Sequence, residues 1–136
     1  MKRWLRAAAR GDDGAAVVEF VLIAALVMGL LLAVLQVAVY VHVRNVVAAS
    51  AQEGARYAAN ADVDSGAGAP RTLEIVGNSL GGSTADGLSC SSAEELDSTG
   101  LVLVVVQCTG AVPALFGALG DLLPVNATGR AIKEGQ

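Results

Sequence analysis

The sequence predicts an α+β protein, with a long N-terminal helix followed by a small extracytoplasmic α/β domain that contains a short antiparallel sheet. The first observation is an apolar run over residues 17–41, which holds one acid, one glutamine and no base. A bilayer core of about 30 Å requires about 20 such residues, so the run predicts a transmembrane helix. The second observation is that short apolar runs alternate with Gly-rich and polar stretches after residue 60. The chain has 54% hydrophobic and only 16% charged residues, which argues against an ordinary soluble enzyme.

Residues 1–14 form a basic leader that precedes the apolar run and ends in Gly11-Asp12-Asp13-Gly14. The bases of this leader are Lys2, Arg3, Arg6 and Arg10. Only Arg44 closely follows the run, so the positive-inside rule predicts a cytoplasmic N-terminus and a C-terminal part outside the cell membrane.

The helix is expected to cross the membrane over residues 15–43 and to continue outside it over residues 44–60. Small and apolar residues recur beyond the membrane at spacings of three and four, which is the period of a helix face. This face comprises Val43, Val46, Val47, Ser50, Ala51, Gly54, Tyr57 and Ala58. Gln52, Glu53 and Arg56 lie on the other side, and Glu53 and Arg56 are spaced for a local ion pair.

Residues 61–136 are expected to form the small domain. After a loop over 61–70, Pro70 is suited to be the first residue of a short helix that ends at Gly81-Gly82. The apolar face of that helix consists of Leu73, Val76 and Leu80. The polar stretch over 83–100, which includes Cys90, is expected to be mostly loop with some local turn or strand.

The last third of the chain predicts two strands and one more helix. Residues 101–107 are β-branched and apolar between turn residues, which is typical of a buried strand. Residues 113–122 predict a second short helix, and residues 125–132 alternate weakly as a last strand. Pro124 suits an edge position because proline cannot donate to a sheet ladder.

Cys90 and Cys108 both fall in the part that is expected outside the cytoplasm, where oxidising conditions permit a disulfide. One pairing would contribute about 3 kcal/mol by closing the intervening loop. Two unrelated buried thiols are the alternative. The single histidine, His42, lies far from both cysteines in the sequence, so no metal site is expected.

Composition and motifs also exclude several classes of function. The net charge of −4 argues against binding to nucleic acid, which requires clustered bases. A single histidine at the membrane boundary leaves no Ser/His/Asp or Cys/His arrangement, and no phosphate-binding glycine motif is present, so we expect neither an enzyme nor a cofactor. Glu94, Glu95 and Asp97 are interpreted as a solvated acidic run.

Glu19 does not fit a simple membrane anchor, because an acid near the start of a span is costly. A glutamate near the boundary can extend to the lipid headgroups, but its context is distinctive. Gly14 ends the basic leader, Glu19 follows five residues later, and Phe20 comes next. This pattern resembles the processing signal of type IV pilins, and the Glu-Phe pair resembles the Flp/Tad branch.

A second motif lies just beyond the span, where residues 51–59 read Ala-Gln-Glu-Gly-Ala-Arg-Tyr-Ala-Ala. It is similar to the post-membrane helix of TadE-like pseudopilins, and the matching positions that we single out are Glu53, Gly54, Arg56 and Tyr57. The resemblance covers about residues 11–60. It implies that a prepilin peptidase cuts between Gly14 and Ala15 and that Glu19 and Phe20 act in assembly.

The resemblance therefore implies a minor pilin or pseudopilin of a Tad-type (Flp) pilus or secretion apparatus. Its partners would be prepilin peptidase, other Tad pilins, the Tad assembly machinery and the lipid membrane. We expect a single-pass protein of the bacterial cytoplasmic membrane that can enter an extracellular pilus. Two alternatives are an uncleaved membrane-anchored accessory or binding protein and a secreted protein cut after Ala49-Ser50-Ala51.

Overall fold

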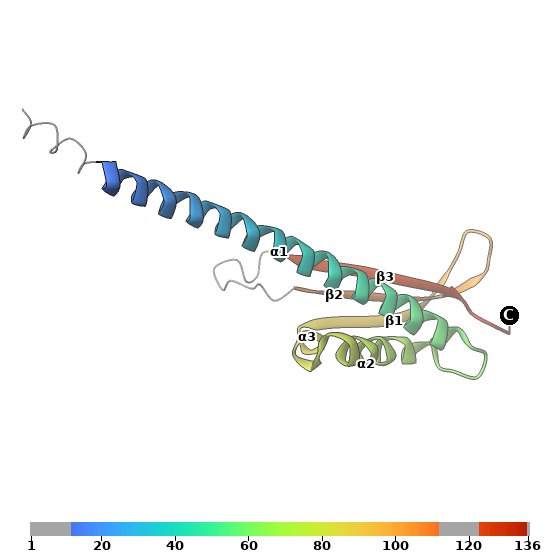
Figure 1. The fold of residues 1–136 in the computed structure, drawn as a ribbon. Coiled ribbons are helices and arrows are strands. Elements are labelled where there is room, and N and C mark those ends of the chain that lie inside the picture. Colours follow the sequence, from blue (N-terminus) through green and yellow to red (C-terminus); the bar gives the residue numbers. More distant parts are fainter. Residues whose placement is uncertain (1–11, 112–122, 136) are drawn as a thin grey trace, which may run out of the picture. The chain divides into compact units, whose positions relative to one another are not determined.

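A computed structural model of the 136-residue chain describes residues 12–111 and 123–135. The chain forms two compact units, Met1–Val37 and Ala38–Gln136. The first element, α1 (Asp12–Ala59), belongs to both units, and all the other described elements belong to the second (Figure 1). The fold is α+β, with a long apolar N-terminal helix followed by a small domain with a three-stranded antiparallel sheet, which confirms the predicted class.

Helix α1 is one uninterrupted helix of 48 residues, because its sequence contains no proline and few weak helix formers. It ends close to the predicted position. Asn60 donates its backbone N–H and its side-chain amide to Tyr57 O, at 3.4 and 3.0 Å, which stops the helical ladder. Lys133 Nζ also donates to Ala58 O, at 3.0 Å, so a cation satisfies a carbonyl at the C-terminal end.

Three short helical segments follow α1. They are the 3₁₀ turn η2 (Ser65–Ala67), α2 (Gly68–Leu80) and α3 (Gly82–Asp86). Helix α2 confirms the predicted helix but begins two residues before Pro70. Gly81 ends it with φ of +95°, a conformation that suits glycine. The sequence analysis did not predict α3.

The sheet has the order β1-β2-β3, with β1 (Leu88–Leu96), β2 (Val102–Ala111) and β3 (Pro124–Ile132). Both pairings are antiparallel, and Cys90 lies opposite Cys108. Strand β2 extends to Ala111, four residues further than predicted. Strand β3 confirms the weak prediction for the last strand, with Pro124 at its first position on an edge of the sheet.

Strand β1 corrects the prediction of a mostly loop segment over 83–100. Its serine-rich sequence has low intrinsic strand preference, but it pairs along its whole length with β2. Pairing with a valine-rich neighbour outweighs the local preference of a polar segment. The helix that the sequence predicts over 113–122 lies outside the described residues.

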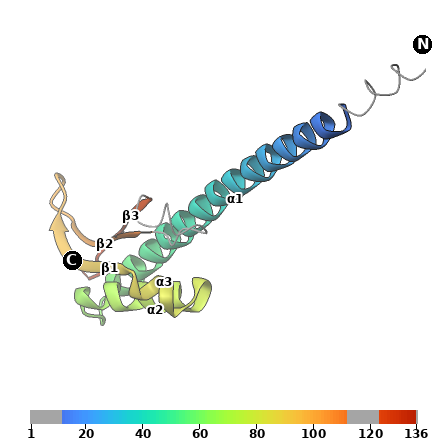
Figure 2. The same ribbon diagram turned by 90° about the vertical axis from the view of Figure 1, so that its left-hand side faces the viewer.

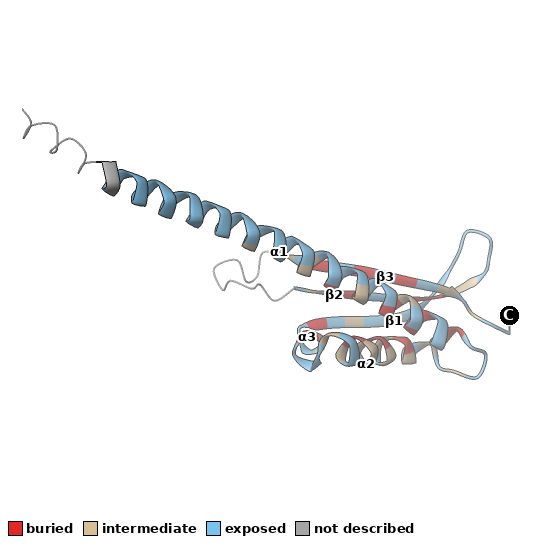
Figure 3. Ribbon diagram, viewed as in Figure 1, coloured by how far each residue is buried: buried red, intermediate tan, exposed pale blue. Residues whose placement is uncertain are grey.

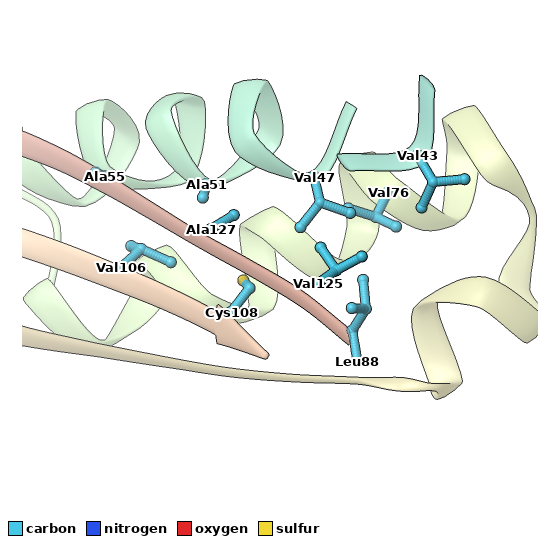
Figure 4. Close-up of a cluster of buried hydrophobic side chains, with 10 residues drawn as sticks. All are labelled: Val43, Val47, Ala51, Ala55, Val76, Leu88, Val106, Cys108, Val125 and Ala127. Carbon is cyan, nitrogen blue, oxygen red and sulfur yellow. The ribbon is translucent and has the colours of Figure 1, made fainter. Parts of the chain in front are cut away.

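The core lies on one face of the sheet, between the strands and the helices α1 and α2 of the second unit (Figures 2 and 4). Its buried members are Val43, Val47, Ala51, Ala55, Val76, Leu88, Val106, Cys108, Val125 and Ala127. The opposite face of the strands carries mainly polar side chains such as Ser91, Gln107 and Thr128, which are exposed. This arrangement is usual for an antiparallel sheet with one solvated face.

Candidate functional site: the N-terminal helix

The first unit presents an apolar helical surface that no other described part of the chain covers. All residues from Gly14 to Leu31 are exposed, and Phe20 and Leu26 are 72% and 73% exposed (Figure 3). The helix from Gly14 to Ala59 is long and apolar enough to cross a membrane by length and composition. So much exposed apolar surface in one segment requires lipid or partner helices around it.

Gly14, Ala15, Glu19 and Phe20 all lie on this exposed part of α1. Ala15 and Glu19 are four residues apart in the helix, so they occupy the same face one turn apart. Added bulk at Gly14 would meet no described atom within 4 Å. Gly14 and Glu19 thus both lie on an accessible helix, and Glu19 shares a helix face with Ala15.

In the second unit, Gly54 lies where α1 and α2 approach most closely. A Cβ at this position would overlap Thr72 Oγ1 and would lie 2.6 Å from Gly68 O. Thr72 Oγ1 also donates to Gly68 O at 2.8 Å and to Ser50 O at 3.3 Å. Gly54 is therefore part of a close helix contact that a side chain would prevent.

Of the other motif positions that we single out, Glu53 and Arg56 face outward, whereas Tyr57 contacts α2. Glu53 and Arg56 are exposed and do not form the ion pair that their spacing suggested. Within residues 12–111 and 123–135, an ion pair forms instead between Arg71 and Glu74 of α2, with 2.8 Å between Arg71 Nη1 and Glu74 Oε2. The Arg71 guanidinium lies 5.6 Å from the centroid of the Tyr57 ring, within cation–π range. The motif thus contains two residues that contact α2 and two that point to solvent.

Comparison with known proteins assigns this segment. The family model described as TadE-like protein matches residues 14–56. Residues 14–56 are thus similar to TadE-like proteins, and we call them the TadE-like segment. The match begins at Gly14 and ends at Arg56, so it covers the membrane-length part of α1 and most of the post-membrane motif. No curated protein and no solved structure matches the chain.

The match confirms the resemblance that the two sequence motifs indicated. TadE-like proteins are pilin-like proteins associated with Tad pili, a structural class rather than an enzyme class. The matched segment also accounts for the candidate membrane span, consistent with a membrane-anchored Tad component.

Two residues of the TadE-like segment that the sequence analysis did not single out attach it to β3. Gln52 Nε2 donates to Arg130 O at 2.7 Å, and Arg130 N donates to Gln52 Oε1 at 3.2 Å. Tyr40 OH donates to Pro124 O at 3.2 Å. Gly129 lies between these contacts, and a Cβ there would overlap the Ala51 carbonyl. The glycine inside the strand pattern was the one local signal of this close approach.

Cys90 and Cys108 lie outside the TadE-like segment and are joined by a disulfide across β1 and β2. Cys108 is fully buried in the core, whereas Cys90 is partly exposed. Among the residues that the structure describes, no group of His, Cys, Asp and Glu is arranged to hold a metal ion.

Proposed function

We propose that this chain is a minor pilin or pseudopilin of a Tad-type (Flp) pilus or secretion apparatus. In this proposal, prepilin peptidase removes residues 1–14, and the N-terminal helix then mediates assembly. The observation that carries the proposal is the TadE-like match that begins at Gly14, on a helix whose apolar surface is exposed throughout its first part.

Cleavage after Gly14 would change the electrostatics of the helix end. It would remove the four bases of the leader and create an amino group on Ala15. Because Glu19 is one turn from Ala15 on the same face, its carboxylate can compensate that positive charge. An acid in the first turns of a helix also interacts favourably with the helix dipole.

Assembly would bring this charge pair into apolar surroundings. Opposite charges attract strongly at low dielectric, and an unpaired charge there is costly. Glu19 can therefore pair with the Ala15 amino group of its own chain or of a neighbouring subunit and set the stagger between helices. Phe20 and the surrounding aliphatic residues would then pack against lipid or other Tad pilins.

The proposed location is the bacterial cytoplasmic membrane, with the N-terminus in the cytoplasm and the C-terminal domain outside. The distribution of Lys and Arg around the span supports this orientation. The disulfide supports it too, because disulfides persist in oxidising compartments. Glu53 and Arg56 remain exposed on the post-membrane helix, where subunits of the apparatus can contact them.

The assembly step is tested by comparing two variants in cells that make the whole apparatus. Glu19→Ala should enter the membrane and lose its leader normally but should appear at least about tenfold less in the sheared pilus fraction. Glu134→Ala removes an exposed acid of the second unit that lies outside the N-terminal helix and is the matched control, with incorporation expected near wild type. Equal incorporation of both variants would contradict the proposed role of Glu19.

A further inference from the structure

The two outer edges of the three-stranded sheet differ in what covers them. In an antiparallel sheet, successive residues of an edge strand alternately direct their N–H and C=O groups toward the neighbouring strand and away from it. The outward groups of an edge strand can pair with another strand unless something blocks them.

The hydrogen bonds between the strands identify the outward groups of each edge. Lys133 N donates to Val102 O at 2.9 Å, so even-numbered residues of β2 bond to β3. Odd-numbered residues of β2 therefore bond to β1, and their partners there are also odd-numbered, as in the pair of Val105 with Ala93. The even-numbered residues of β1 and β3 consequently point their backbone groups outward.

The outer edge of β3 is occupied by α1. The outward N–H and C=O of Arg130 pair with the Gln52 amide, and the outward C=O of Pro124 accepts from Tyr40. The close approach of Gly129 to Ala51 places the helix backbone against this strand as well. A further strand has no access to this part of the edge.

The backbone of the outer edge of β1 has no such partner among the described residues, although the turn η2 bonds to two of its side chains. Ser92 Oγ donates to Ser65 O, and Ser65 Oγ donates to the Glu94 carboxylate. Its outward residues are Leu88, Cys90, Ser92, Glu94 and Leu96. No described backbone or side-chain group bonds to their outward N–H and C=O groups. The strand is nine residues long and contains no proline or lysine, the residues that commonly protect exposed edges.

The charge and size of the β1 side chains indicate which kind of strand would pair with it. Glu94 and Glu95 are exposed near its end, and the strand contains no base. Leu96 follows them and is 75% exposed, so the same end also offers apolar surface. The first part of the strand carries small side chains that tolerate a close neighbour.

We propose that the outer edge of β1 is a docking site for an extended strand of another protein that carries basic side chains. Its lysines or arginines would lie opposite Glu94 and Glu95, and an apolar side chain would contact Leu96. Backbone hydrogen bonds would supply affinity, and the charged pairs would supply specificity. This proposal stands on the sheet alone and does not depend on the role proposed for Glu19.

A second copy of this chain fits the outer edge of β1 less well than a basic strand does. Its β3 edge is covered by α1, so β1 of one copy has no strand of that type to join in another. Pairing of β1 with β1 would bring only acids and no base to the shared sheet. The exposed glutamates therefore favour a strand of opposite charge.

The test uses the full chain in detergent micelles and a short peptide of alternating valine and threonine that begins with two lysines. Antiparallel pairing places these lysines opposite Glu94 and Glu95. Amide hydrogen exchange, measured by NMR, should slow at Ser92 and Glu94 on peptide addition. A matched peptide that begins with two glutamates should bind roughly tenfold more weakly.

Two variants test the charge requirement. Glu95→Lys should weaken binding of the lysine peptide roughly tenfold and should strengthen binding of the glutamate peptide. Glu134→Lys makes the same charge change at an exposed position outside the sheet and should leave binding unchanged. The proposal is overturned if neither peptide protects these amides or if both bind the wild type equally. Protection that grows with protein concentration alone would also overturn it, because the occupant would then be a second copy.

Discussion

At the scale of single residues, the post-membrane helix is attached to its domain by several side chains. Some of these could be recognised from the sequence, and others could not. Gly54 stood out as part of a motif, and the structure gives it a packing role against Thr72. Gln52 was assigned to the polar side of the helix, yet its amide pairs with Arg130, 78 residues away. Helical periodicity identifies a face, but it does not reveal which distant strand a polar side chain will meet.

Gly54→Ala should lower the free energy of unfolding by about 1–3 kcal/mol, because the new methyl group overlaps Thr72 Oγ1 and crowds the Gly68 carbonyl. Thermal unfolding of the full chain in detergent, followed by near-UV circular dichroism, measures the change. Gly82→Ala is the control, since a Cβ there meets no described atom within 4 Å. Equal stability of the two variants would show that α1 and α2 do not depend on this close approach.

Gln52→Leu should cost about 1–2 kcal/mol, because two hydrogen bonds to Arg130 are lost. Hydrogen exchange at the Arg130 amide should accelerate in the same variant. Gln107→Leu, on the exposed face of β2, is the comparison, because it makes the same substitution at a glutamine whose side chain has no described hydrogen-bond partner. An unchanged exchange rate at Arg130 would contradict the contact.

At the scale of elements, the long helix and the last two strands could be predicted because their patterns are strong or bounded by turn residues. The helix has no proline over 48 residues, and β2 has a run of β-branched residues. Strand β1 could not be predicted, because its Ser-rich sequence gains strand structure only through pairing with β2. The outward backbone groups of its edge could likewise not be predicted, because they follow from the register of the sheet.

The disulfide belongs to this scale because it joins neighbouring positions of β1 and β2. Replacing both Cys90 and Cys108 by alanine should lower the free energy of unfolding by about 3 kcal/mol, since the unfolded chain regains loop freedom. Denaturant unfolding of the oxidised wild type and the double variant measures the difference. A reduced wild type that unfolds at the same denaturant concentration as the oxidised form would contradict this expectation.

At the scale of the whole molecule, the chain divides between a helix without a core and a domain with one. Every member of the main buried cluster lies between Val43 and Ala127, within the second unit. The exposed apolar residues of the first unit have no described cover. From one apolar run, the sequence predicted a membrane span over residues 15–43 and a small domain over residues 61–136, and the Gly14-to-Glu19 spacing indicated the resemblance to the family.

A fragment of residues 38–136 should therefore fold as a soluble domain with the disulfide formed, because it retains the whole cluster. Cooperative thermal unfolding and a native near-UV circular dichroism spectrum without detergent are the expected results. A fragment that is soluble only in detergent would place part of the domain's stability in residues 1–37.

The most direct test of the proposed function is the N-terminus of the protein isolated from its native membrane, determined by mass spectrometry. The account predicts a chain that begins at Ala15, produced by cleavage after Gly14 in cells that contain prepilin peptidase and absent from cells that lack it. A chain that begins at Met1 in both would identify an uncleaved anchor, and one that begins at Gln52 would identify a secreted protein. Either of these results would contradict processing as a pilin.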